Sequence, residues 1–207
     1  ERKRAAPAAA GVPAADAPPA ATEAGGAREA PPQPKLEERS LEKVNQLMAA
    51  LLSGASLKGF LEDLLGSLLE VFGAEHAFAL FVQGGSVIVE AEKAPEGKTG
   101  LDPEKALCLK LIGCTVASKA PYLLADVADD GEAARELESQ GSAARSLLVA
   151  PFPIEGKWCG VLYLLNPRLP QGGDAGVFRI VAPFLNLASL AYRQLTPEAV
   201  PQAAAPR

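Results

Sequence analysis

One stretch of this chain, residues 144–166, limits the possible folds more than any other. It holds two apolar runs, residues 147–154 and 158–165, separated only by Glu155-Gly156-Lys157. Both runs are rich in residues that favour strands, and three residues between them are too few for anything but a hairpin. The pattern therefore predicts two central antiparallel strands.

Two prolines fall in the first of these runs. Pro151 and Pro153 have no amide hydrogen to donate to a neighbouring strand. We therefore expect this strand to bend, to carry a bulge, or to turn those positions away from a neighbour.

The composition excludes several classes of function. The 207 residues carry a formal net charge of −5, one His and three Cys. Because the charge balance is mildly acidic, we expect no nucleic-acid partner, and because no apolar run is long enough to cross a bilayer, we expect no membrane partner. Three cysteines without a CxxC motif or a Cys/His cluster predict free thiols in a reducing cytoplasm, and neither a metal site nor another cofactor.

The composition also divides the chain. The first 35 residues contain 13 Ala and 7 Pro, which cannot form a packed core. We predict a disordered linker over residues 1–36, a single domain over residues 37–195 and a disordered tail over residues 196–207. A docking segment for a partner is the alternative interpretation of the N-terminal stretch.

An amphipathic helix is predicted for residues 37–52. Its apolar positions Leu41, Val44, Met48 and Leu51 alternate spacings of three and four residues. Fewer than three heptads do not define a coiled coil, so two roles stay open. These four residues either pack on the chain's own domain or form the interface of a dimer.

The remaining elements follow from periodicity and from capping signals. Ser56 and Gly73 are suited to begin and end a second helix, and Asp102 with Pro103 to begin a third. We expect Pro183 to kink the last helix or to mark its true start. The expected order is a helix over 57–72, a hairpin of strands 76–82 and 86–92, a helix from 103 to about 118, a short strand over 121–125, a surface helix over 129–140, the central hairpin, and a last helix over 174–195.

Three local motifs occur in order along the chain. They are Pro121-Tyr-Leu-Leu-Ala-Asp-Val127, Arg145-Ser-Leu-Leu-Val-Ala-Pro151 and Gly160-Val-Leu-Tyr-Leu-Leu-Asn166. Together with the order of elements, they make residues 55–195 resemble the GAF family of sensory domains. The resemblance implies an α+β fold, a GAF-like antiparallel sheet flanked by helices, with a bundle of the first and last helices on one face and a small-molecule pocket on the other. Members of the family bind cyclic nucleotides, tetrapyrroles, haem, iron or small metabolites, and many dimerise through the helical face.

The cyclic-nucleotide motif of the family is degenerate here. Asn166 and Phe178 match it, but Pro167 replaces its Lys, and Ala182-Pro183 replace its acidic pair. We therefore expect no cyclic-nucleotide binding. The Cys-His pair of bilin-binding members is also missing, and His76, as the one His, is expected to be structural rather than a ligand of haem or iron.

A thiol enzyme is the sharpest catalytic hypothesis. Gly113-Cys114-Thr115 resembles part of a segment in the free methionine-sulfoxide reductase branch of the family, whose chemistry needs a reactive thiolate and a resolving cysteine. The second expected cysteine is replaced within Ser142-Ala143-Ala144, and Cys108 is a poor resolving partner on a straight helix. With Leu107 and Leu111, Cys114 is expected on the buried face of its helix, so we favour the interpretation that these thiols are small buried hydrophobes.

The function predicted from the sequence is that of a non-catalytic regulatory or protein-interaction module of a bacterial-type signalling protein in the cytoplasm. A small-molecule sensor with an apolar pocket and a thiol-dependent enzyme are the alternatives. The expected partner is a second copy or another protein, with a small-molecule ligand as an option. The candidate ligand-binding residues are Cys114, Tyr122, Asp126 and Arg145; Asp126 is alternatively a turn cap and Arg145 a solvated strand end.

Overall fold

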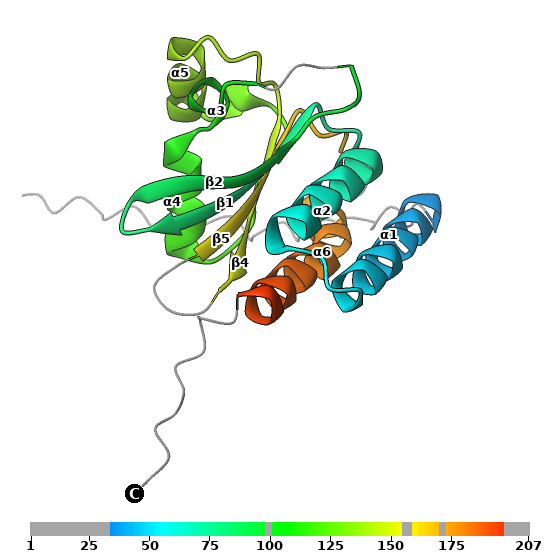
Figure 1. Ribbon diagram of the computed structural model, residues 1–207. Coiled ribbons are helices and arrows are strands. Elements are labelled where there is room, and N and C mark those ends of the chain that lie inside the picture. Colours follow the sequence, from blue (N-terminus) through cyan, green and yellow to red (C-terminus); the bar gives the residue numbers. More distant parts are fainter. Residues whose placement is uncertain (1–33, 98–100, 155–158, 170–172, 197–207) are drawn as a thin grey trace, which may run out of the picture.

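A single five-stranded antiparallel sheet lies between two layers of helices (Figure 1). The computed structural model describes residues 34–97, 101–154, 159–169 and 173–196. The first helix begins at Pro34, so residues 34–36, which the composition assigned to the linker, are helical. The rest of the predicted linker, and all but Thr196 of the predicted tail, lie outside the described residues.

The predicted elements occur in the predicted order, except that the helix expected from residue 103 is divided into two and a short 3₁₀ helix follows β3. The strands are arranged β2-β1-β5-β4-β3, which puts β5 at the centre of the sheet and β4 beside it. The elements are α1 (Pro34–Leu52), α2 (Leu57–Phe72), β1 (His76–Gln83), β2 (Ser86–Lys93), α3 (Pro103–Ala106), α4 (Leu109–Ser118), β3 (Tyr122–Leu124), the short 3₁₀ helix η1 (Val127–Asp129), α5 (Gly131–Ser139), β4 (Leu147–Pro153), β5 (Cys159–Leu165) and α6 (Gly173–Leu195).

Capping residues set the ends of α2 as the sequence predicts. The Ser56 side chain accepts a hydrogen bond from the backbone N–H of Gly59, and Gly73 ends the helix with a φ of 56°. That left-handed conformation is natural for glycine, which has no Cβ to clash with the backbone. The second predicted helix is therefore confirmed at both ends.

The two prolines of β4 lie where this strand has only one neighbour. β3 pairs with residues 147–149 alone, whereas β5 pairs with the whole of β4. Pro151 and Pro153 therefore fall on an open edge, where a missing donor leaves no ladder bond unmade. Of the three options that the sequence left open, the structure supports the one in which these positions face away from a neighbour.

The helix predicted from residue 103 to about 118 is interrupted. α3 ends at Ala106 and α4 begins at Leu109, because Leu107 and Cys108 have extended backbone angles. The interruption changes the phase of the second half, so that Leu111, Ile112 and Thr115 point inward. Cys114, predicted on the buried face, is exposed instead.

α6 continues through Pro183 rather than starting there. Within the described residues it is the one helix long and apolar enough, by length and composition, to cross a membrane. That corrects the sequence-based expectation that no such run exists. Its buried side chains join the core between the helices and the sheet: Val177, Ile180, Val181, Phe184, Leu187, Ala188, Ser189 and Ala191.

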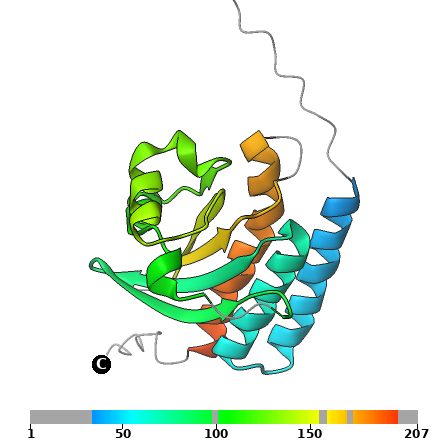
Figure 2. The same ribbon diagram turned by 90° about the horizontal axis from the view of Figure 1, so that it is seen from above.

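α1, α2 and α6 lie side by side on one face of the sheet (Figure 2). α1 packs within its own chain, where Leu47 and Leu51 are 2% and 5% exposed. The hydroxyl of Ser40, itself buried, donates to the backbone carbonyl of Ile180 in α6. The predicted first helix is thus a member of the domain's own helical layer.

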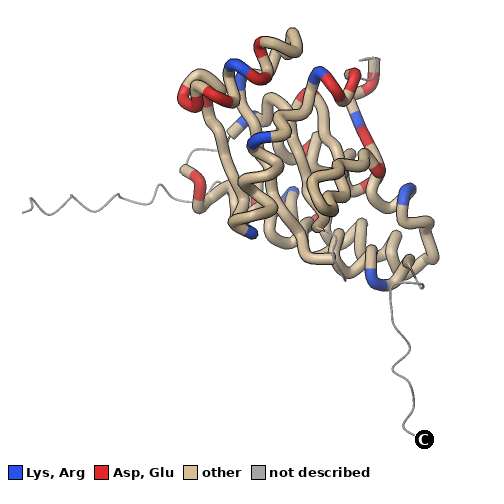
Figure 3. The backbone as a smooth tube through the Cα atoms, turned by 90° about the vertical axis from the view of Figure 1, so that its left-hand side faces the viewer, with Lys and Arg blue, Asp and Glu red and all other residues tan. Residues whose placement is uncertain are grey.

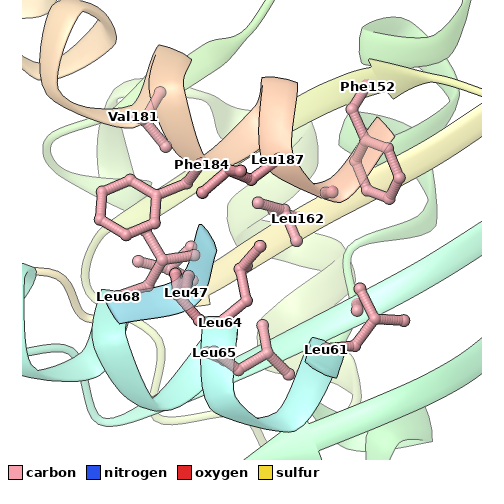
Figure 4. Close-up of a cluster of buried hydrophobic side chains, with 14 of the residues drawn as sticks. Leu47, Leu61, Leu64, Leu65, Leu68, Phe152, Leu162, Val181, Phe184 and Leu187 are labelled. Carbon is pink, nitrogen blue, oxygen red and sulfur yellow. The ribbon is translucent and has the colours of Figure 1, made fainter. Parts of the chain in front are cut away.

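Charged positions lie mainly along the outer helices and loops, and the strands in the middle of the molecule carry few (Figure 3). Between the sheet and the helical layer lies an apolar core to which α1, α2, β4, β5 and α6 all contribute (Figure 4). Burial of this continuous apolar surface is the main force that holds the helical layer to the sheet. The side chains labelled in Figure 4 are Leu47, Leu61, Leu64, Leu65, Leu68, Phe152, Leu162, Val181, Phe184 and Leu187.

Candidate functional site

The face of the sheet opposite the helical layer is where the family resemblance predicts a small-molecule pocket. α3, α4 and α5 lie on this side of the sheet (Figure 1). Side chains from the strands and these helices fill the space between them, and each is at most 7% exposed. They are Phe78, Leu80, Val82, Ala106, Leu107, Cys108, Leu111, Ile112, Leu124, Val127, Ala133, Leu137, Leu147, Val149, Val161, Tyr163 and Leu165. We call this set the pocket-side core.

Tyr163 of the central strand β5 is a fully buried member of the pocket-side core. Its hydroxyl accepts a hydrogen bond from the backbone N–H of Cys108 (3.2 Å) and donates one to the backbone carbonyl of Ala106 (3.1 Å). These two groups flank the interruption between α3 and α4, where helical bonding stops. Burial raises the pKa of the Tyr163 phenol, which stays protonated as a donor. The Tyr163 side chain thus packs in the pocket-side core and also bonds to two backbone groups at the interruption between α3 and α4.

Glu136 of α5 caps the N-terminus of α4. Its carboxylate accepts hydrogen bonds from the backbone N–H groups of Leu109 (2.6 Å) and Lys110 (3.3 Å). It also accepts one from the Cys108 thiol, with Sγ 3.2 Å from Oε2. A carboxylate here compensates the orphan amides and the positive end of the helix dipole, a position where an anionic ligand would otherwise be favoured.

The three cysteines lie in different surroundings. Burial raises the pKa of the Cys108 thiol to about 12, and burial also raises the pKa of Cys159. Cys108 is buried and bonded to Glu136, whereas Cys114 is exposed on the outer side of α4. Since the thiolate is the nucleophile, the two raised pKa values oppose thiol chemistry at these positions.

A second polar cluster ties α4 to α5. The Lys110 ammonium lies 2.9 Å and 3.2 Å from the two Asp130 oxygens and 2.9 Å from Glu132. Asp130 also accepts the backbone N–H groups of Glu132 and Ala133, which makes it the N-cap of α5. The hydrogen bond from Lys110 lowers the pKa of Asp130 to about 2, and the same hydrogen bond raises the pKa of Lys110.

Tyr122 is one of the four candidate ligand-binding residues, and it borders this cluster. Its hydroxyl donates to Asp130 at 3.5 Å. Tyr122 also lines an open groove of about 750 Å³ between β3 and α5, together with Leu123, Leu124, Ala125, Asp129, Gly131 and Arg135. This groove is open at the surface and shares Leu124 with the pocket-side core.

The other three candidates lie elsewhere. Asp126 caps η1, with its side chain accepting the N–H of Ala128 at 2.9 Å. Arg145 is an exposed strand end that bonds through its backbone, and Cys114 is exposed on α4. The structure therefore does not bring the four candidate residues together into one site.

Asn166 holds three strand ends in place. Its side-chain oxygen accepts the backbone N–H groups of Arg145 (2.6 Å) and Ser146 (3.2 Å), and its amide donates to Glu75 at 2.8 Å. Its φ of 51° is left-handed, a conformation that Asn tolerates better than most residues. The asparagine that matches the cyclic-nucleotide motif is thus engaged in structural bonds.

Within the described residues, no three His, Cys, Asp or Glu side chains lie close enough together to hold a metal ion.

The fold is that of GAF domains, in agreement with the resemblance seen in the sequence. A free methionine-R-sulfoxide reductase from Neisseria meningitidis, solved with its substrate, superposes with a TM-score of 0.59 at 17% identity over 79% of this chain and 93% of that one. The A. aeolicus NLH2 GAF domain in an inactive state gives 0.59 at 15% identity over 77% and 98%. The GAF domain of a phosphoenolpyruvate-protein phosphotransferase from Coxiella burnetii gives 0.55 at 18% identity over 78% and 98%.

These likenesses concern the fold. No family model and no curated protein matches the sequence itself. The solved structures include a whole enzyme and GAF domains of larger proteins, so the fold does not decide the role and the argument must come from the site.

Proposed function

We propose that this chain is a non-catalytic regulatory or protein-interaction module of a signalling protein and acts in the cytoplasm. The observation that carries the proposal is the filled pocket-side core. Tyr163 is fully buried within it and makes both of its hydrogen bonds to the chain's own backbone. When a GAF domain fills its ligand space with its own side chains, its outer surfaces remain available for interaction with a partner.

The cytoplasmic part of the proposal rests on the cysteines. All three are free thiols, as is usual in a reducing compartment.

The thiol-enzyme alternative finds support in the fold of the Neisseria reductase but not in the thiols of this chain. Its chemistry requires a thiolate within reach of a second cysteine, whereas the buried Cys108 and the exposed Cys114 face different surroundings. An assay of free methionine-sulfoxide reduction, with the Neisseria enzyme as the positive control, should give no turnover. Turnover that disappears in Cys114→Ser would overturn the non-catalytic proposal.

The small-molecule sensor is the second candidate, and the open groove at Tyr122 is the observation that favours it. Such a groove offers a phenol, an ion pair and the side chains of β3. Native mass spectrometry of protein purified from its own host separates the two. A mass equal to that of the polypeptide, or a multiple of it, supports the interaction module.

A co-purifying small molecule would favour the sensor, and two variants locate it. Loss of the molecule in Tyr122→Ala, but not in Tyr192→Ala, assigns it to the groove, since Tyr192 packs on Phe81 on the other face of the sheet.

The degenerate motif also predicts no saturable binding of cyclic AMP or cyclic GMP at micromolar concentration, which calorimetry can measure.

A further inference from the structure

Six large hydrophobic side chains are exposed in the part of the chain that the structure describes, and Ile88 is the one that belongs to a strand. Leu41 and Met48, which the sequence assigned to a dimer interface, are exposed on α1. Of the other two residues assigned to that interface, Val44 is half-buried and Leu51 belongs to the chain's own core. Nothing in the described residues covers that face, so the dimer stays a prediction.

The strand that carries Ile88 lies at one margin of the sheet (Figure 1). β2 has eight residues and pairs with β1 alone. Within the described residues, its other long edge therefore has no neighbouring strand. Such an edge presents unpaired backbone groups and is a template for pairing with another chain.

The turn of the β1–β2 hairpin decides which backbone groups of β2 face this open edge. Gln83 and Ser86 are partners across the two-residue loop formed by Gly84 and Gly85. The loop residues have φ angles of 56° and 88°, as a type I′ turn requires. The two residues that flank such a loop form a hydrogen-bonded pair, and bonded pairs alternate with non-bonded pairs along an antiparallel ladder.

Val87 and Val89 accordingly turn their backbone groups away from the sheet. Ser86 and Ile88 stand in the hydrogen-bonded pairs, so their N–H and C=O groups are directed to β1. The two valine side chains pack partly against the pocket-side core, whereas Ile88 faces the other side of the sheet with its partner Phe81. An added strand would thus find two sets of donors and acceptors beside an exposed apolar side chain.

Only one half of this edge has the usual protection against pairing. The register of β2 on β1 shifts so that Glu90 is the extra residue of a β-bulge, and the exposed Glu92 and Lys93 follow it. Bulges and charges of this kind discourage pairing at an open edge. Residues 86–89 carry neither, and the opposite margin of the sheet, β3, is only three residues long.

The charges near the protected half are mostly acidic. Lys93 lines a groove of about 380 Å³ between α1 and α2, together with Glu62 and Asp63. In the described part of the chain, no ion pair includes these two carboxylates or those of Glu90 and Glu92 on the strand. A second copy of the chain would bring further carboxylates to this edge, whereas a basic segment is complementary to it.

We propose, building on the interaction function proposed for this chain, that the open edge of β2 binds an extended basic segment of a partner protein. The segment adds a sixth strand to the five-stranded sheet and exchanges backbone hydrogen bonds with Val87 and Val89. It covers Ile88 and places lysine or arginine side chains near Glu90 and Glu92.

A synthetic peptide of alternating valine and lysine, with both ends blocked, is the probe for this edge. Titrated onto the full chain, it should bind at least about tenfold more tightly than the same peptide with glutamate in place of lysine, because the glutamates meet like charges. Amide hydrogen exchange followed by NMR should slow at Val87 and Val89 when the lysine peptide binds. Exchange at Ile88 should not change, since its N–H is already directed to β1.

Two variants separate the backbone contact from the side-chain contact. Val87→Pro removes an outward donor without removing a bond to β1, and should weaken binding of the lysine peptide by about tenfold. Ile88→Lys leaves the backbone unchanged but sets a positive charge beside the peptide, and should weaken binding to a similar extent. The control is Leu109→Lys, the same substitution at a 56% exposed leucine of α4, which packs on β4 and β5. It should leave binding unchanged, and urea midpoints close to that of wild type show that the variants fold.

The inference is overturned if the lysine peptide does not bind, if the glutamate peptide binds equally well, or if exchange at Val87 and Val89 does not slow. Binding to Ile88→Lys that equals binding to wild type would also overturn it. A dimer of the free chain in which these two amides are already protected would assign the edge to a second copy instead. All these outcomes leave the proposed function standing, which fails separately if the chain shows enzymatic turnover or co-purifies with a small molecule.

Discussion

The ring of Phe152 lies directly on Gly160 of the neighbouring strand. The two residues are cross-strand partners in β4 and β5, and a Cβ built on Gly160 would lie 2.2 Å from two carbon atoms of the ring. Phe152 is 1% exposed and belongs to the core between the sheet and the helices. The glycine is therefore needed for close approach of an aromatic ring rather than for an unusual backbone angle.

Gly160→Ala should destabilise the protein by about 2 kcal/mol, because the added methyl group forces a buried ring out of place in a packed core. The urea midpoint of unfolding measures this. The matched control is Gly113→Ala on the exposed side of α4, where a Cβ meets no atom within 4 Å. There the change should be neutral or stabilising by up to about 1 kcal/mol, since alanine is the better helix former.

A double variant assigns the cause. If the ring is what the methyl group displaces, the effects of Phe152→Leu and Gly160→Ala should be strongly non-additive, with the second change costing less once the ring is gone. Additive effects would instead locate the cost in the backbone of β5.

The elements that the sequence predicted correctly depend on short-range signals. Ser56 and Gly73 delimit α2 because a cap and a left-handed residue act on their own helix. The central hairpin is likewise specified by two apolar runs and a turn. Such signals are complete within a few residues and need no knowledge of the rest of the fold.

The interruption between α3 and α4 could not be predicted in the same way. It depends on the Tyr163 hydroxyl, which lies 55 residues from Cys108 in the sequence. The three-and-four pattern through Leu107, Leu111 and Cys114 predicts one continuous helix. The change of helical phase and the exposure of Cys114 could not be predicted from it. The same limit hid Glu136, whose helix-capping partners precede it by 26 and 27 residues.

The candidate site likewise combines features that local sequence signals predict with features that depend on distant contacts. A GAF-type pocket could be expected from motifs, but whether side chains fill it depends on how Tyr163 and its neighbours pack across the sheet. The alternative role of Asp126, a turn cap, could be predicted from the sequence because it depends only on neighbouring residues.

Glu136→Ala should destabilise the protein by about 1 kcal/mol, because the first amides of α4 lose their acceptor and the helix dipole loses its compensating charge. Glu136→Gln should cost less, since its amide oxygen can still accept. Glu138→Ala, on the exposed side of the same helix, is the control and should be nearly neutral. Faster labelling of the Cys108 thiol in Glu136→Ala, measured with a thiol reagent in a Cys114→Ser background, would show that α5 has loosened over that residue.

The contact between Lys110 and Asp130 predicts a pH dependence. The pKa of Asp130 falls from its ordinary value of 3.8 to about 2 in the folded protein, mainly through the hydrogen bond from Lys110. A lowered carboxyl pKa gives stability that is present above pH 4 and disappears as the pH falls toward 2. Wild type should therefore exceed Asp130→Asn in urea midpoint at pH 5, and the difference should shrink between pH 4 and 2. A difference that stays constant over this range would exclude the ion pair as its source.

Tyr163→Phe tests the polar contact inside the pocket-side core. The variant keeps the ring and its packing but removes the one atom that bonds to both the Cys108 N–H and the Ala106 carbonyl. Because these groups are buried at the interruption between α3 and α4, leaving them without a partner should cost about 2 kcal/mol. Tyr122→Phe is the matched control, since that half-buried hydroxyl makes a single 3.5 Å contact with Asp130 and its loss should cost less than about 0.5 kcal/mol. Hydrogen exchange should locate the difference, with faster exchange at residues 106–110 in Tyr163→Phe only. Equal and small losses in the two variants would mean that water or a local shift replaces the hydroxyl, and that the closed pocket does not depend on this bond.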